Sequence, residues 1–246
     1  MAARHSGDRA HPRAARVLAR TDDRRTIDGS DRARRTPAQF RSTHDTTVDV
    51  RCAALFVQPD GCYVGRPDID AWPEQRDARR YAGPLPVVAH PPCQLWGAMA
   101  NVNYARWGGE HNRPGNDGGC FAAALQSVRR FGGVLEHPAK TKAWAAHGLA
   151  QPSGIGWQRT IDGGWVCEVW QSAYGHRANK ATWLYYCGTR PPLNLRWSRP
   201  KGTHQVGFHD QRGKLANKPT LGKREANATP EEFMNALLTL AIYCNA

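Results

Sequence analysis

The feature that most constrains the fold is a short apolar run, Val87-Val88-Ala89, that soon meets two prolines at Pro91 and Pro92. Proline has no backbone N–H to donate to a sheet ladder and fixes its own φ angle, so a strand must end here. The turn that follows carries Cys93. Because ligands bind at the carboxyl ends of strands in open α/β sheets, the thiol is predicted at a site-forming edge. The alternative is a buried structural cysteine, since free cysteine is among the most buried residue types.

Two further segments repeat this pattern of a strand with a chemical group at its end. Residues 132–138 read Gly-Gly-Val-Leu-Glu-His-Pro, an apolar strand that delivers the carboxylate of Glu136 and stops at a proline. Residues 174–186 read as a polar turn with two cations, Arg177 and Lys180, that leads into an aromatic-rich strand. A thiol, a carboxylate and a cation at three strand ends are able to meet in one pocket.

This series resembles the catalytic half of the DNA (cytosine-5) methyltransferases, especially their short phage and prophage relatives. Pro92-Cys93-Gln94 is similar to the family's Pro-Cys-Gln nucleophile motif, and Glu136-His137-Pro138 to its Glu-Asn-Val or Glu-Asn-Pro motif. Residues 175–183 resemble the family's Gly-x-Pro-Gln-x-Arg-x-Arg segment. The resemblance covers roughly residues 85–190. It implies an α/β, Rossmann-like methyltransferase-type sheet in a single domain, and a transferase that acts on DNA with S-adenosylmethionine as the methyl donor.

The resemblance also implies a role for each residue. Carbon-5 of cytosine becomes nucleophilic only after a thiolate adds to carbon-6, which would be the role of Cys93. A carboxylic acid then protonates ring nitrogen N3, which would be the role of Glu136. Lys180 and Arg177 are the candidate cations that stabilise the thiolate. The remaining implied contacts are Pro91 for the cofactor and Gln94, Asn101, Asn103, Tyr104 and Arg106 for DNA.

The sequence departs from the family's motifs in two places. The family's Gln and two Arg fall on Ala178, Lys180 and Thr182, so the arginine that accompanies the nucleophile is missing. His137 stands where the family has asparagine. Its imidazole is able to hydrogen-bond or to titrate near physiological pH; the alternative is a histidine that only orients the turn.

The family's Phe-x-Gly-x-Gly-Gly loop, which holds S-adenosylmethionine, does not occur in this chain. After a predicted strand over residues 53–57, its place is taken by residues 58–67, where two glycines permit a close backbone approach. We therefore expect a reduced or degenerate cofactor half. The residues expected to face the cofactor are Phe56, Gly61, Gly65 and Asp70, the last as a candidate for the ribose. The alternative for residues 58–67 is a plain hairpin turn.

Composition favours a polyanionic partner. The chain of 246 residues has a formal net charge of +13. Residues 1–46 hold 11 Arg and six Asp, which leaves +8 for the rest; a basic folded part favours DNA, because phosphate contacts release counterions. No apolar run approaches membrane-spanning length, so no membrane partner is expected. Seven cysteines, an odd number with no Cys-x-x-Cys pair, are typical of reduced thiols in a cytoplasm and suggest no metal site.

The predicted organisation has four parts. Residues 1–46 are Arg-rich, have few apolar residues and are predicted to be a disordered tail. Residues 47–190 form the catalytic α/β domain, residues 191–222 a small basic loop region suited to DNA recognition, and residues 223–246 a C-terminal helix that packs back on the domain. Thr229 is the predicted N-cap of this helix, with Pro230 at its first position.

Two segments inside the catalytic domain are also predicted. Residues 97–119 carry six glycines and are predicted to form a long loop, which in the family closes over the extruded base. Residues 118–131 are predicted to form a helix that ends at Gly132-Gly133.

The sequence therefore predicts a DNA cytosine-5 methyltransferase-like enzyme. Two alternatives stay open. One is a pyrimidine carbon-5 modification with a different one-carbon donor, which the missing glycine loop encourages. The other is a non-catalytic DNA-binding relative that kept the shape of the pocket and lost the cofactor.

Overall fold

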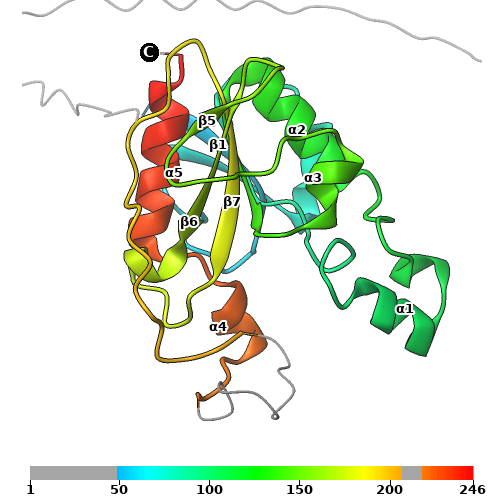
Figure 1. The fold of residues 1–246 in the computed structure, drawn as a ribbon. Helices are drawn as coiled ribbons and strands as arrows, with labels where there is room; N and C mark the ends of the chain where they lie inside the picture. Colours follow the sequence, from blue (N-terminus) through cyan, green and yellow to red (C-terminus); the bar gives the residue numbers. More distant parts are fainter. Residues whose placement is uncertain (1–48, 207–217, 246) are drawn as a thin grey trace, which may run out of the picture. The chain divides into compact units, whose positions relative to one another are not determined.

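A seven-stranded mixed sheet with the order β2-β1-β3-β4-β7-β6-β5 organises the computed structural model, which describes residues 49–206 and 218–245 (Figure 1). The parallel half comprises β1 (Cys52–Val57), β2 (Ile69–Pro73), β3 (Val87–Ala89) and β4 (Gly133–Pro138). The other half comprises β5 (Gln158–Arg159), β6 (Trp165–Trp170) and β7 (Ala181–Cys187), with β7 antiparallel to both β4 and β6. The predicted α/β, Rossmann-like class is confirmed at this level.

Helices cover both faces of the sheet. On one face, α2 (Cys120–Phe131) and α3 (Lys142–Ala146) enclose a core that includes Phe121, Leu135 and Trp144. On the other, α5 (Glu231–Tyr243) lies against β1, β3 and β4 and buries Phe233 and Leu237. Each such side chain contributes about 1.5–3 kcal/mol when it is withdrawn from water.

Both predicted helices are present, with one correction. Helix α2 ends at Gly132, whose φ of 81° favours glycine. Helix α5 packs back on the domain as predicted, after the short helix α4 (Lys223–Asn227). The predicted cap is wrong by one residue: the N-cap of α5 is Pro230 rather than Thr229, and no side chain accepts a capping hydrogen bond there.

The prediction of a long loop over residues 97–119 is wrong, because this segment contains α1 (Ala100–Trp107) and the 3₁₀ helix η3 (Glu110–Asn112). Its glycines stand at position 97 and from position 108 onward and leave residues 98–107 without one, so a helix is able to form. Figure 1 shows α1 set apart from the sheet. We call residues 97–119 the arm. Two hydrogen bonds close its base: the Trp96 indole donates to Asp117 at 2.9 Å, and the Gly115 N–H donates to the Leu95 carbonyl at 2.9 Å.

The hairpin alternative for residues 58–67 is also wrong, because β1 and β2 are parallel. The segment is a crossover made of turns, the first closed by the Gly61 N–H, which donates to the Gln58 carbonyl at 3.0 Å. Short 3₁₀ helices η1 (Glu74–Arg76) and η2 (Ala78–Arg80) follow β2, and η4 (Gln171–Tyr174) follows β6.

The remaining predicted parts are only partly described. Residues 1–46, predicted as a tail, lie outside the described residues. The described residues all belong to one compact unit. Within residues 188–206 and 218–222, regular pairing is limited to the bridges Ala178↔His204 and Gln205↔Thr220. In the part of the chain that the structure describes, no helix is long and apolar enough to span a bilayer.

Candidate functional site

Three predicted site residues meet at the carboxyl edge of the parallel half. Strands β3 and β4 are parallel, so the Cys93 turn and the end of β4 lie at the same edge. Strand β7 is antiparallel to β4 and pairs Thr182 with Pro138, so the start of β7 reaches this edge too. Cys93, Glu136 and Lys180 consequently interact electrostatically with one another.

Glu136 is buried, with 9% of its surface exposed, and both carboxylate oxygens accept hydrogen bonds. Oε2 lies 3.0 Å from Nδ1 of His90, and Oε1 accepts from Nε2 of Gln171 at 3.1 Å. The same Gln171 nitrogen also lies 3.0 Å from the Thr182 hydroxyl. On its far side, Nε2 of His90 lies 2.9 Å from the hydroxyl of Tyr63. A hydrogen-bonded chain of five side chains therefore crosses the sheet edge around the carboxylate.

The charges of this cluster are coupled. Burial opposes ionisation of Glu136, but the hydrogen bond from His90 and the charge of Lys180 outweigh it, so the pKa of Glu136 is lowered. Burial and the charge of Glu136 raise the pKa of Cys93, while Lys180 acts in the opposite direction. Burial lowers the pKa of Lys180. The resting site thus combines an ionised carboxylate with a protonated thiol beside a partly desolvated amine.

Lys180 is held in place by its backbone and by the chain before α5. Its φ of 38° is unusual for a residue other than glycine, and such strain clusters at functional sites. Its Nζ donates to the carbonyls of Asn227 and Ala228, at 3.4 and 3.2 Å. The ammonium is therefore positioned between the C-terminal segment and the Cys93 turn.

Arg177 does not join this cluster. Its guanidinium pairs with Glu225 of α4 at 2.7 Å and contacts the ring of His204. The expectation that Arg177 stabilises the thiolate is therefore corrected, because its charge is engaged at the basic loop and α4.

His137 is a core residue and does not titrate near neutrality, contrary to one sequence expectation. Only 1% of its surface is exposed, and burial lowers its pKa to about 4. Its ring packs edge-on against Phe121 and stacks with Trp144. Alternation along β4 directs it to the face opposite Glu136.

The residues expected to face the cofactor lie at different positions along the strands and the loops that connect them. Phe56 ends the regular part of β1, where the register with β2 shifts, and has a φ of 58°. Gly65, with a φ of 83°, has open space where a side chain would be. Pro91 is buried beneath the Cys93 turn. Phe56 and Pro91 therefore lie close to the carboxyl ends of β1 and β3, whereas Gly65 lies in the crossover that leads to the start of β2.

Asp70 is not at this edge, which corrects its predicted place. It pairs with Ala53 near the start of β2, and its carboxylate binds Arg76 at 2.5 Å and the Trp72 indole at 2.7 Å. The acid that does follow the end of β2 is the exposed Glu74. The proline that ends the strand just before it was the signal that could have identified it.

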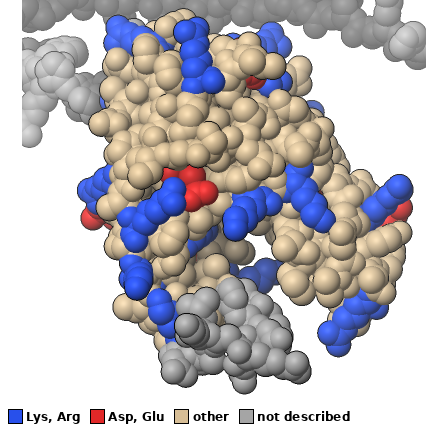
Figure 2. All heavy atoms as spheres, in the orientation of Figure 1, with Lys and Arg blue, Asp and Glu red and all other residues tan. Residues whose placement is uncertain are grey.

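The predicted DNA contacts are all exposed. Gln94 follows the nucleophile directly, and Asn101, Asn103, Tyr104 and Arg106 lie on α1. Every residue of α1 after Ala100 is exposed, including Val102 and Trp107 at 52% and 68%. Figure 2 shows Lys and Arg side chains spread over this side of the molecule, with few acids among them.

Sequence reasoning missed three polar members of the cluster: Tyr63, His90 and Gln171. His90 immediately precedes the prolines of the nucleophile motif, so its position beside a strand end was a usable signal. Tyr63 lies in the crossover and Gln171 follows β6, and nothing in their local sequence marks them. Thr182, at the position of the family's missing arginine, contacts Gln171 instead.

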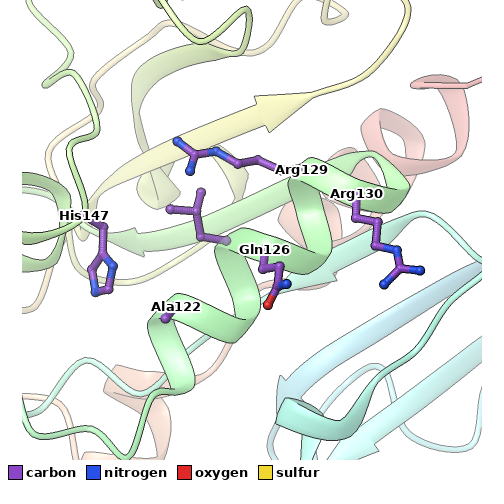
Figure 3. A pocket seen from close by; sticks show the side chains of 6 residues that line it. Ala122, Gln126, Arg129, Arg130 and His147 are labelled. Carbon is purple, nitrogen blue, oxygen red and sulfur yellow. The ribbon is translucent and has the colours of Figure 1, made fainter.

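A separate hollow of about 440 Å³ lies on the outer side of α2 (Figure 3). Its lining residues are Ala122, Leu125, Gln126, Arg129, Arg130 and His147. None of them belongs to the Cys93 cluster, and Arg129 is already bound to Asp162 at 2.7 Å. This hollow therefore does not contribute to the candidate site.

Comparison with known proteins adds no identification. No protein-family model, no curated protein and no solved structure matches the chain significantly. Among the described residues, no group of three or more His, Cys, Asp or Glu side chains is arranged to hold a metal ion.

Proposed function

We propose that this protein is a transferase that modifies carbon-5 of cytosine in DNA through a covalent adduct with Cys93. The observation that carries the proposal is the convergence of Cys93, Glu136 and Lys180 at the carboxyl edge of a Rossmann-like sheet. Cys93 attacks carbon-6, Lys180 stabilises the thiolate, and Glu136 delivers a proton to N3.

The proposed substrate is a base extruded from the duplex, because a thiol cannot reach the ring face inside a stack. Arm residues 97–119 supply exposed polar groups beside the nucleophile. The described residues carry 21 Lys and Arg against 14 Asp and Glu, which supports a polyanionic partner.

The proposed reaction is methyl transfer from S-adenosylmethionine. The carboxyl ends of β1 and β2 are the expected binding place in such sheets. Phe56 lies near the end of β1, and Glu74, which follows β2, is our candidate acid for the ribose. If this is correct, Glu74→Gln weakens S-adenosylmethionine binding measured by calorimetry, whereas Asp70→Asn does not.

A second candidate is carbon-5 modification with another one-carbon donor. The observation that favours it is the β1–β2 crossover, which consists of turns and lacks a glycine-rich loop. Absence of S-adenosylmethionine binding by a protein that still forms a cytosine adduct would favour this candidate.

The decisive experiment is trapping on DNA that carries 5-fluorocytosine, in the presence of the donor. The fluorine blocks the elimination that frees the enzyme, so a stable protein–DNA complex is expected, and Cys93→Ala should abolish it. Cys120→Ala, a half-buried cysteine on α2, is the matched control and should leave trapping unchanged. Trapping that persists in Cys93→Ala would refute the mechanism. DNA binding without trapping in the presence of cell extract, which supplies candidate donors, would favour the non-catalytic relative.

A further inference from the structure

The environment of Glu136 poses a problem for the proposed reaction. The N3 step needs a protonated carboxyl, but the hydrogen bond from His90 and the charge of Lys180 keep the pKa of Glu136 low at rest. Gln171 is an amide and has no proton to release to Oε1. The titratable group in hydrogen-bond contact with the carboxylate is His90, at 3.0 Å.

We propose that His90 loads Glu136 with the proton that Glu136 gives to the substrate, so that imidazole and carboxylate work as one acid. The inference rests on the proposed function. His90 does not touch the base in this scheme; it acts through Glu136 as a positioning and proton-supplying residue.

The hydrogen-bond pattern fixes the direction of the transfer. An ionised carboxylate accepts only, so Nδ1 of His90 must carry the hydrogen that faces Glu136. In the neutral ring, Nε2 is then an acceptor, and the Tyr63 hydroxyl at 2.9 Å is its donor. Burial raises the pKa of Tyr63 well above its ordinary value, so the phenol keeps its proton. Tyr63 consequently holds the ring in the orientation that aims Nδ1 at the carboxylate.

The exposure of His90 to water suits its role as a proton supplier. The His90 side chain is 13% exposed, so water can reach the ring, whereas Tyr63 behind it is 2% exposed. Three titratable groups interact with His90: Tyr63 on the crossover, and Glu136 and His137 on β4. Cys93 and Lys180 act on the other partner of the pair, Glu136. His137 stays neutral, as its pKa is about 4.

The proposed step moves one proton from His90 through Glu136 to N3 of cytosine. A proton from water converts His90 to imidazolium, hydrogen-bonded to Glu136 through Nδ1–H and to the Tyr63 oxygen through Nε2–H. The Cys93 thiol releases its proton to water and becomes a thiolate beside Lys180. As the thiolate sulfur bonds to carbon-6, the C5–C6 π pair moves to C4–C5 and the C4–N3 π pair moves to N3. The Nδ1 proton passes to Oε2 of Glu136 and from Glu136 to N3. His90 is left neutral, and elimination of the adduct returns the proton to the pair.

The test is His90→Asn, which keeps an N–H donor near the position of Nδ1 but cannot carry a second proton. The measurement is the single-turnover rate of adduct formation on 5-fluorocytosine DNA, with donor present, across pH 5–9. The rate should fall by about a hundredfold, the lower range for loss of an acid–base group. The dependence of the rate on pH should change, while DNA affinity stays the same.

The control is His147→Gln, which removes a histidine on the opposite face of the sheet and should keep the wild-type rate and profile. The tautomer of His90, read from ¹⁵N chemical shifts of the free protein, is an independent test: Nδ1–H is expected, and Nε2–H would overturn the scheme whatever the protein acts on. A wild-type rate and profile in His90→Asn would overturn this inference alone. No adduct in the wild type would overturn the proposed function, and this inference with it.

Discussion

At the scale of single residues, the site depends on opposed electrostatic effects. Burial alone would keep both Cys93 and Glu136 protonated, yet Lys180 and His90 favour their charged forms. Lys180 itself is destabilised as a cation by burial. Lys180 thus favours the charged forms of both Cys93 and Glu136. Its role is larger than the sequence suggested, where Thr182 stands at the position of the family's arginine.

The role of Lys180 is testable through the thiol. Lys180→Met removes the charge that lowers the pKa of Cys93, so the thiolate should form only at higher pH. We expect alkylation of Cys93 to shift to higher pH, with a tenfold lower rate at a given pH for each unit of pKa. Peptide mapping after iodoacetamide treatment resolves Cys93 from the other cysteines. Lys180→Arg should keep most of the wild-type profile, and an unshifted profile in Lys180→Met would contradict the assignment.

A second residue-level prediction concerns acid stability. Burial opposes ionisation of Asp162, but hydrogen bonds from Thr160, Arg129 and Tyr185 outweigh it and lower its pKa to about 2. A carboxyl whose folded pKa lies below its unfolded value adds stability above the unfolded pKa, near 3.8, and loses it as pH falls through 2.

Asp162→Asn should therefore cost about 1–2 kcal/mol at pH 7, after allowance for its partial exposure. The difference from wild type should shrink between pH 4 and pH 2, in urea titrations at each pH. A pH-independent difference would show that the loss comes from geometry and not from charge. Asp77→Asn, at a partly exposed carboxylate that pairs with Arg79, is the comparison and should have a smaller effect.

At the scale of elements, the direction of β7 decides the site. A parallel β7 would place its amino end at the opposite edge, away from the Cys93 turn. Antiparallel pairing instead sets Thr182 against Pro138 and Leu184 against Glu136. Helix α5 then covers the face from which Glu136 projects, and the chain before it binds Lys180.

Helix α5 should accordingly be a large stability element. Leu237 is fully buried between α5 and the sheet, so Leu237→Ala should cost about 2–5 kcal/mol in chemical denaturation. Thr239→Ala, on the exposed side of the same helix, is the matched control and should cost under about 1 kcal/mol. Equal losses for the two would mean that α5 does not pack as described.

At the scale of the whole molecule, positive charge is spread over both the N-terminal segment and the folded part. Within the described residues, the cores lie between the sheet and its two helical layers. We expect this part to be stable without residues 1–46 and to bind DNA through its own basic residues.

Deleting residues 1–46 should leave a protein that melts cooperatively at nearly the full-length temperature, because this segment has few apolar residues to bury. Calorimetry of the two proteins makes the comparison. Loss of the cooperative transition on deletion would place residues 1–46 in the folded core.

Affinity for duplex DNA should fall steeply with salt in the same deleted protein, because +8 charges remain for phosphate contacts. Fluorescence anisotropy between 50 and 200 mM salt measures the slope, which we expect to be negative on a log–log plot. If the affinity did not change with salt concentration, phosphate contacts would be excluded as its source.

The sequence alone determined the elements that carry the proposed chemistry. Prolines after short apolar runs ended β3 at Ala89, shortly before Cys93, and β4 at Pro138, two residues after Glu136, since local backbone chemistry decides where a strand stops. The apolar faces of α2 and α5 were predicted from the periodic spacing of their apolar residues, which is also a local property of the sequence.

Tertiary structure alone decided what surrounds those groups. Tyr63 and His90 are 27 residues apart, and Gln171 follows Glu136 by 35, so their hydrogen bonds follow from strand order and not from local pattern. Tertiary structure likewise pairs Arg177 with Glu225 of α4. It also places Asp70 near the start of β2, away from the carboxyl edge that holds Cys93. Sequence periodicity shows which side of a strand is buried, whereas the partner of a buried polar group depends on which strands become neighbours.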